Sequence, residues 1–311
     1  MNTYNTMEHN NLDQGHQLQP GIDKNELTLV WQCDRKNVWE ESWIEYLFRN
    51  IPHKTLDESS RHQTLFIDNS VIIDHMGWGT EQSHIDYMKK MESLNYSYSL
   101  IHLSDEARTS RIDSYNNCKS VIRYYYRSDV PNSDTRLTIP CGWNTGFTDV
   151  TDNPSITDRS ISWAFIGQRL DHNRINMINI LETIPNGLCY IGEHHGPRMS
   201  VIEMSKQYRN SKFIICPDGA VVPDSFRVYE AFEAGCIPVV QRSTYWGEFH
   251  GSTFPAIQVD SWNQLPGIIQ QLTTDLTELE KLRLECVAWW DSLKDQLTKN
   301  VENIINTTIN I

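Results

Sequence analysis

The sequence has no long apolar run and is poor in basic residues. None of its apolar stretches approaches the ~18–20 residues that a membrane-spanning helix needs. Lysine and arginine total 27 against 40 aspartates and glutamates, so the 311 residues carry a formal net charge of −13. Nucleic acids and anionic membranes select basic surfaces. A nucleic acid is therefore excluded as the main partner, and no transmembrane segment is expected.

Paired cysteine motifs are absent as well. The seven cysteines are an odd number, lie far apart and include no Cys-x-x-Cys pair, which argues against both a disulfide framework and a zinc site. The first 24 residues contain no apolar segment of the kind that a secretory signal needs. We expect residues 1–24 to form a polar, flexible leader on a soluble cytoplasmic protein.

The chain does contain short apolar runs that alternate with longer amphipathic stretches, which is typical of βαβ units and a parallel sheet. Strands are predicted at residues 27–33, 63–73, 98–103, 120–126, 161–167, 187–192, 212–217 and 236–241. Helices are predicted at residues 37–50, 81–95, 174–184, 199–210 and 225–235, and most of 261–309 is expected to be helical. The pattern indicates an α/β protein with lobes over residues 25–150 and 151–270 and C-terminal helices over 271–311.

The densest chemical signal is the segment 211–241, SKFIICPDGAVVPDSFRVYEAFEAGCIPVVQ. A hydrophobic strand ends at Cys216, a loop follows, and Ser225 stands at the N-cap of a short helix. Ligands of open parallel sheets bind beyond the carboxyl ends of strands, and a helix N-terminus attracts phosphate. Arg227 adds a positive charge for phosphate oxygens, and Glu230 on the same helix face can accept hydrogen bonds from a ribose diol. The alternative is an ordinary Arg227–Glu230 ion pair behind a capping serine.

This segment resembles the C-terminal signature of exostosin-type glycosyltransferases, in which a "CP-G…SFR-YEA--AGCIPV" pattern recurs. The pieces SLIHLSDE, CKSVIRYYY, TIPCGWNTGF and WAFIGQR agree in order, so the resemblance spans roughly residues 98–241. It implies a GT-B fold, that is, two facing Rossmann-like domains with a cleft between them, here followed by a C-terminal helical tail. It also implies that the C-terminal domain binds a nucleotide sugar, usually a UDP-sugar.

By motif match, the resemblance places Ser225 and Arg227 on the diphosphate and Glu230 on the ribose. In WAFIGQR, Gly167 would let the backbone approach the phosphates and Arg169 would neutralise the leaving group, whereas the alternative is a plain turn with a surface arginine. No Asp-x-Asp pair follows a strand, and arginine with a helix dipole can stabilise the departing UDP. We therefore expect a UDP-sugar donor, no obligatory cofactor and no metal.

An inverting transfer needs one general base for the acceptor hydroxyl, and two places in the N-terminal lobe qualify. Asp105 and Glu106 follow the apolar strand of SLIHLSDE, and Asp74 and His75 stand in a similar position in VIIDHMGWG. The alternative for the first pair is helix capping by the preceding serine with acids in the first turn. Arg123, in an otherwise apolar strand, is expected to pair with the SDE segment or with the acceptor, or to lie at an exposed strand end.

Together these expectations describe an inverting, metal-independent glycosyltransferase that moves a sugar to a hydroxyl of a glycan acceptor. UDP-xylose is the first donor choice, ahead of UDP-glucuronate, UDP-galactose and UDP-N-acetylglucosamine. Animal exostosins carry an N-terminal membrane anchor that this sequence lacks, so a cytoplasmic enzyme of surface or capsid glycan synthesis is expected. The alternative is a non-catalytic, two-lobed protein that binds a sugar or nucleotide. A Rossmann oxidoreductase is disfavoured, because no GxGxxG follows the first strand of either lobe.

Overall fold

The computed structural model describes residues 27–33, 35, 38–57, 66–75, 81–110, 112–192 and 199–308. The predicted leader, residues 1–24, lies outside the described residues.

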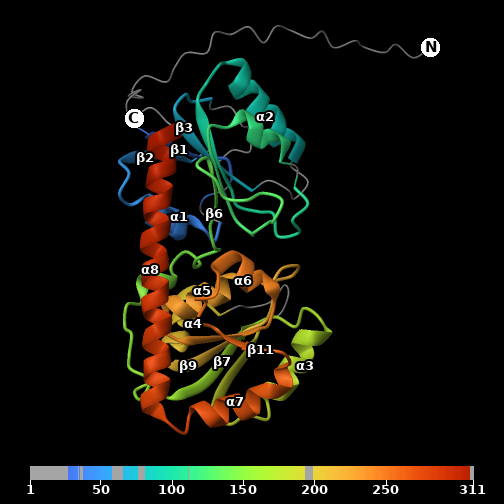
Figure 1. Cartoon of the computed structure of the whole chain (residues 1–311), viewed down its shortest axis with the longest axis vertical. Coiled ribbons are helices and arrows are strands. Elements are labelled where there is room, and N and C mark those ends of the chain that lie inside the picture. The colour runs from blue at the N-terminus through green and yellow to red at the C-terminus, as the bar shows by residue number, and fades with distance from the viewer. Residues whose placement is uncertain are drawn as a thin grey trace, which may run out of the picture.

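Two parallel β-sheets form the centres of two lobes that stand one above the other in Figure 1. The N-terminal sheet has the strand order β2-β1-β3-β4-β5-β6, and the C-terminal sheet has the order β11-β10-β9-β7-β8. The N-terminal strands are β1 (Leu27–Trp31), β2 (His53–Asp57), β3 (Ser70–Asp74), β4 (Tyr98–His102), β5 (Val121–Arg123) and β6 (Arg136–Thr138). The C-terminal strands are β7 (Ile161–Gly167), β8 (Gly187–Ile191), β9 (Ser211–Cys216), β10 (Ile237–Gln241) and β11 (Ile257–Val259).

In each sheet, the strand that comes first in the chain lies in the interior of the sheet. β1 pairs with both β2 and β3, and β7 pairs with both β8 and β9. The apolar residues of β1 and β7 are buried on both faces of their sheets, as expected for parallel strands that lie between helices. The strand order reverses beside such a first strand, and ligands of open α/β sheets bind there, outside the carboxyl ends of the strands. In the C-terminal lobe this position lies beyond the ends of β7, β8 and β9.

Helices connect the strands and cover the sheets. They are α1 (Glu41–Phe48), α2 (Glu81–Ser93), α3 (His172–Leu181), α4 (Val201–Arg209), α5 (Phe226–Glu233), α6 (Thr244–His250), α7 (Leu265–Leu272) and α8 (Leu276–Thr308), with short 3₁₀ turns at Asp113–Asn117, Phe147–Asp149 and Trp262–Gln264. The predicted α/β class, the two facing Rossmann-like domains and the helical C-terminal tail are confirmed. The limits 25–150, 151–270 and 271–311 stay a prediction.

The tail is dominated by α8, a helix of 33 residues that runs the length of both lobes in Figure 1. It packs on α5, α7 and β10 of the C-terminal lobe and on α1 and β6 of the N-terminal lobe. Its Trp290 ring stacks on Tyr229 of the C-terminal lobe at 5.6 Å and on Trp43 of the N-terminal lobe at 5.8 Å between centroids. Arg49 of the N-terminal lobe donates a hydrogen bond to Thr298. The helix therefore joins the lobes through aromatic and polar contacts.

Several elements differ from the sequence expectation. The sequence pattern does not predict β2, β6, β11 and α6, which are short and lack a clear apolar period. The strand expected over residues 120–126 ends at Arg123, since Tyr125 has φ of 59°, a left-handed conformation that no strand continues. The helix expected from residue 37 begins at Glu41.

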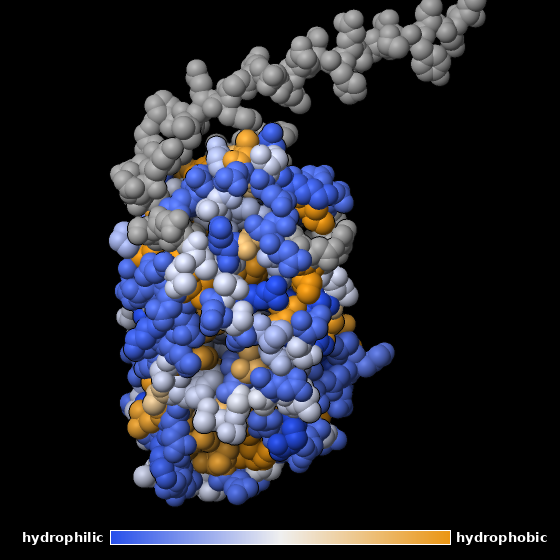
Figure 2. Space-filling model, turned by 45° about the horizontal axis from the view of Figure 1, so that its top comes forward, coloured by the Kyte–Doolittle hydropathy of each residue, from blue (hydrophilic) through white to orange (hydrophobic). Residues whose placement is uncertain are grey.

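The surface in Figure 2 is largely hydrophilic, with apolar residues in separate patches. Among the described helices, none combines the length and the apolar character that crossing a membrane requires.

Candidate functional site

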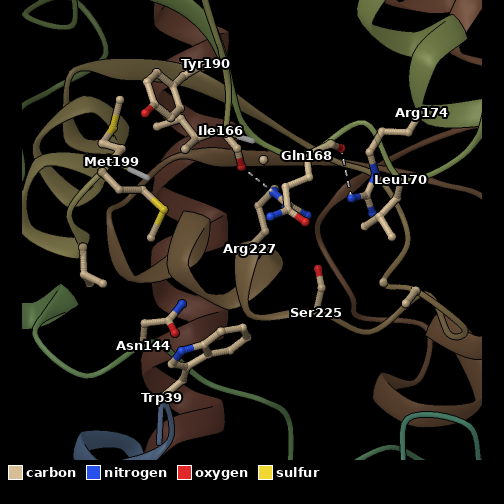
Figure 3. Close-up of a pocket in the computed structure, with 16 residues that line it drawn as sticks. Trp39, Asn144, Ile166, Gln168, Leu170, Arg174, Tyr190, Met199, Ser225 and Arg227 are labelled. Atoms are coloured by element: carbon tan, nitrogen blue, oxygen red, sulfur yellow. Dashed lines mark hydrogen bonds between the residues drawn. The ribbon is translucent and has the colours of Figure 1, made fainter. Parts of the chain in front are cut away.

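A pocket of about 420 Å³ lies between the lobes, at the reversal of strand order in the C-terminal sheet. Gly167 at the end of β7, Gly192 just after β8 and the turn at Gly219 and Ala220 after β9 form one wall. The N-terminal lobe closes the pocket with Trp39 and Asn144, which lie together at one side in Figure 3. The pocket therefore occupies the place where an α/β sheet of this topology binds ligands.

Arg227, in the first turn of α5, reaches the pocket and is held on two sides. Its Nε donates to the carbonyl of Ile166 at 3.3 Å, and its guanidinium lies 5.4 Å from the centroid of the Phe165 ring (Figure 3). A Cβ at Gly167 would stand 3.0 Å from Arg227 Nη2 and 2.8 Å from the Phe165 ring. Gly167 thus gives the arginine room, and the expected approach of its backbone to phosphate stays a prediction.

Arg174 is a second guanidinium on the same pocket, and the sequence interpretation missed it. It lies in the first turn of α3, where the Asp171 side chain caps its backbone N–H. Its Nη1 donates to the carbonyl of Gln168 at 3.4 Å, and its Nη2 donates to the carbonyl of Asp218. Burial and the neighbouring charge of Arg227 lower the pKa of Arg174 to about 10. Two cations that repel each other across one pocket favour a ligand with more than one negative charge.

The predicted Arg169 lies between Gln168 and Leu170, which both line the pocket. It is exposed in the turn between β7 and α3, and it is not among the described residues that line the pocket. Arg174, six residues from Gln168 along the chain, has no motif around it. Only the start of a helix directly after a strand end could have indicated it.

Ser225 is the N-cap residue of α5, but its side chain forms no cap hydrogen bond. Its Oγ is buried and has no hydrogen-bond partner among the described residues, and Figure 3 shows it beside Arg227. A buried hydroxyl without a partner costs stability, so it is available to a bound ligand. The first N–H groups of α5 and the positive end of its dipole lie at the same place.

Glu230, one turn further along α5, is only 2% exposed. Its Oε1 accepts hydrogen bonds from the Asn144 N–H at 3.2 Å and from the Asn144 side-chain amide at 2.5 Å. Burial raises the pKa of Glu230, and the Asn144 hydrogen bonds and the Arg227 charge oppose that shift. In the described structure Arg227 and Glu230 form no ion pair with each other, so the alternative of an ordinary surface pair is wrong.

Glu106, one of the four candidate bases, extends from the N-terminal lobe to the turn beside the pocket. Its Oε1 accepts hydrogen bonds from the backbone N–H of Ala220 at 2.6 Å and of Val221 at 3.4 Å. A Cβ at Gly219 would lie 2.7 Å from the same oxygen, so only glycine leaves room for the carboxylate there. Glu106 therefore lies against the loop that also presents the Asp218 carbonyl to Arg174.

Asp105 directly precedes Glu106 in the chain, but it has a different environment. It is 4% exposed, its Oδ2 accepts from Arg123 at 2.7 Å and Arg127 at 2.9 Å, and its Oδ1 accepts from the Ser110 N–H at 2.8 Å. Burial raises the pKa of Asp105, but the Ser110 hydrogen bond and the two arginines more than offset this and hold it below its ordinary value. Arg123 thus pairs with the SDE segment. Asp105 organises this loop through hydrogen bonds to both of its carboxylate oxygens.

Asp74 and His75 stand at the carboxyl end of β3 and are not among the described residues that line the pocket. Asp74 is buried and contacts the buried His84 Nδ1. His75 Nδ1 lies 3.0 Å from the Ser104 hydroxyl, and its Nε2 lies 3.6 Å from a carboxylate oxygen of Glu40. Of the four candidates, only Glu106 contacts the loop at the pocket.

Comparisons with known proteins concern the fold. Residues 155–309 match the family model for the RXYLT1 C-terminal domain. No curated protein sequence matches the chain significantly. The fold is similar to Anabaena Alr3699/HepE in complex with UDP, at 11% identity over 91% of this chain and 100% of that chain, with a TM-score of 0.56. It is also similar to an alpha1,3-fucosyltransferase, at 10% identity over 93% of each chain and a TM-score of 0.51.

A third similar structure is TarM, at 11% identity over 77% of this chain and 55% of that chain, with a TM-score of 0.52. The chain has a GT-B fold, and its C-terminal half matches a domain related to glycosyltransferases. The finer, exostosin-type relationship stays a prediction.

Proposed function

We propose that this chain is a glycosyltransferase that moves a sugar from a UDP-sugar to a hydroxyl of a glycan acceptor. One observation carries the proposal: Arg174, Arg227 and the unpartnered Ser225 hydroxyl meet at the start of α5 in an interlobe pocket. Two guanidinium groups, a free hydroxyl donor and a helix N-terminus match the charge and oxygens of a diphosphate. The similarity to a structure solved with UDP supports the same ligand class.

The rest of the pocket suits the nucleoside. Tyr190, Met199 and Ile166 form an apolar end, which lies apart from Arg174 in Figure 3. Glu230 is not among the described lining residues, and it would bind the ribose by exchanging the Asn144 amide, from which its carboxylate now accepts, for the ribose hydroxyls. We propose Arg174, in place of the exposed Arg169, as the second cation on the diphosphate.

Glu106 is proposed as the general base of an inverting transfer. Its carboxylate takes the proton of the acceptor hydroxyl while that oxygen forms a bond to the anomeric carbon from the face opposite the diphosphate. The bond from the anomeric carbon to the phosphate oxygen breaks, and its electron pair leaves with UDP. Arg174 and Arg227 stabilise the charge that develops there, which is the work a metal ion performs in other transferases. Turnover without an added metal follows from this arrangement.

The donor sugar is proposed as xylose first, on the exostosin-type resemblance of residues 98–241. UDP-glucuronate, UDP-galactose and UDP-N-acetylglucosamine come next. The acceptor is proposed to be a surface or capsid glycan, and the compartment to be the cytoplasm.

Calorimetry with UDP, followed by a panel of UDP-sugars read by UDP release, tests the proposal. Wild-type protein and Arg242→Ala, an exposed arginine paired with Asp260, are expected to bind UDP at micromolar concentration. Arg227→Ala is expected to lose that binding. Absence of UDP binding by the wild type would overturn the proposal. UDP binding without release of UDP from any donor in the presence of glycan acceptors would favour the non-catalytic sugar- or nucleotide-binding alternative.

A further inference from the structure

A second opening between the lobes has no part in the proposed nucleotide site. This crevice of about 320 Å³ is bounded by Asn132 and the β6 segment of the N-terminal lobe, by the end of α6, and by one face of α8. We call it the neutral crevice. Its volume falls within the range of small-ligand sites.

The described lining of the neutral crevice has no side chain that is charged at neutral pH. None of the described residues that line it is aspartate, glutamate, lysine or arginine. The face of α8 that lines it consists of residues 289, 292, 293, 296, 297 and 300, which follow the period of a helix. The charged residues of the same stretch, at 291, 294, 295 and 299, all fall outside that face. In a chain with a net charge of −13, this face is therefore set apart by its neutrality.

The polar side chains of the crevice are neutral groups that can form hydrogen bonds. The side chains of Thr253, Ser292, Gln296 and Asn300 line the crevice and make no hydrogen bond within the described part of the chain. Asn132 uses its carbonyl oxygen for the Thr138 N–H at 2.7 Å, which leaves its NH₂ group to donate. The crevice thus offers amides and hydroxyls that both donate and accept.

Aromatic rings form its apolar part. Trp289 is half-buried and is fixed by Phe232 at 4.9 Å and Phe254 at 5.4 Å between ring centroids. Phe249 stacks on Tyr126 of the N-terminal lobe at 5.7 Å. His250 also lines the crevice, and burial lowers its pKa to about 3, so the ring adds no charge at neutral pH. Rigid ring faces beside neutral amides and hydroxyls are suited to a ligand with apolar C–H faces and many hydroxyl groups.

We infer that the neutral crevice binds an uncharged saccharide, and that this saccharide is a part of the glycan acceptor away from the transfer site. The second half of the inference rests on the proposed function. Pro140 lines the crevice and Asn144 lines the nucleotide pocket, and four residues of chain span at most ~14 Å. The two openings therefore lie within the length of a few sugar rings of each other.

A glycan array that carries neutral glycans and glycans with carboxylate, sulfate or phosphate groups tests this inference, with the full chain and without UDP. Ser292→Lys places a long cationic side chain in the crevice from an exposed position. Ala288→Lys adds the same charge to an exposed position of α8 outside the lining and is the matched control. Gln296→Ala removes one amide and is expected to weaken binding about two- to tenfold, the effect of one neutral hydrogen bond.

The wild type and Ala288→Lys are expected to retain neutral glycans, and Ser292→Lys to lose them. All variants are expected to keep the same affinity for UDP. Retention of charged glycans alone, retention of none, or equal retention by Ser292→Lys would overturn the inference even if UDP binds. Conversely, retained neutral glycans without UDP binding would leave the saccharide site in place and remove the proposed transferase function.

Discussion

The Glu106 carboxylate of the N-terminal lobe accepts a 2.6 Å hydrogen bond from the backbone N–H of Ala220 in the C-terminal lobe. This contact places an acidic group of one lobe on the nucleotide-side loop of the other. In the proposed mechanism Glu106 therefore has two separable roles, as the proton acceptor of the transfer and as the oxygen that holds the loop.

Replacement of Glu106 by glutamine and by alanine separates these properties. Glutamine keeps an oxygen that can accept from Ala220 but cannot take a proton, so turnover is expected to fall about 10²–10⁴-fold with UDP affinity unchanged. Alanine removes the oxygen as well, so UDP affinity is expected to fall in addition. Initial rates of UDP release and calorimetry measure the two effects. Normal turnover of Glu106→Gln would show that Glu106 only holds the loop, and His75 would then be the next residue to test.

Arg174→Ala is expected to weaken UDP binding by about 10–100-fold, because hydrogen bonds to charged groups contribute ~1.5–3 kcal/mol each. Uridine has no diphosphate, so its affinity is expected to stay unchanged and serves as the control ligand. Calorimetry with both ligands checks the difference. Equal losses for UDP and uridine would mean that the substitution disturbs the whole pocket and that Arg174 has no specific place on the diphosphate.

Ser225→Ala tests the unpartnered hydroxyl. Because the Ser225 Oγ is buried without a hydrogen bond, its removal is expected to leave the free energy of unfolding unchanged or slightly higher. UDP affinity is expected to fall about two- to tenfold, the worth of one hydrogen bond. Thermal unfolding with and without UDP measures both quantities. A clear loss of stability in the free protein would show that the hydroxyl is a structural cap after all.

Removal of divalent metal is the fourth test. Two guanidinium groups face the place proposed for the diphosphate, so turnover is expected to be the same in EDTA as in its absence. The rate of UDP release with and without EDTA, and again after added Mg²⁺ or Mn²⁺, measures this. Loss of turnover in EDTA that a metal restores would contradict it.

Local sequence patterns predict the structural features that residues close together in the chain determine, such as strands, turns and helix starts. The apolar run before Cys216, the turn after it and the helix from Ser225 all appear where the pattern places them, and so do the two α/β lobes. The GT-B fold was implied by the family resemblance and is confirmed. Arg174 was missed because the pocket reaches it only through the packing of α3 against the loop at Asp218. The Asn144–Glu230 contact joins residues 86 positions apart, which no local period encodes. The distinction between Asp105 and Glu106 likewise depends on long-range contacts, since Arg123, Arg127 and Ala220 decide it.

The environment of Asp105 predicts how the free energy of unfolding depends on pH. Its pKa in the folded protein lies below the ordinary value of 3.8, so the folded state favours the ionised carboxylate. The stabilisation from Asp105 is therefore complete above the ordinary pKa, and it is lost as the pH falls below about 3.8 through the lower folded value. Asp105→Asn leaves the buried Arg123 without its carboxylate partner, whereas Arg127 keeps its ion pair with Asp129. At neutral pH we therefore expect a loss of ~3–5 kcal/mol in the free energy of unfolding.

Denaturant unfolding at several pH values, with Asp295→Asn as the control for an exposed acid, measures this loss. The difference between wild type and Asp105→Asn is expected to be constant near neutral pH and to shrink in acid, because protonation of the wild-type carboxyl removes the same charge. A difference that stays constant down to the acid limit would show that the substitution acts through packing. In that case the two arginines would not depend on the charge of Asp105, and the loop that carries Glu106 would be held by other contacts.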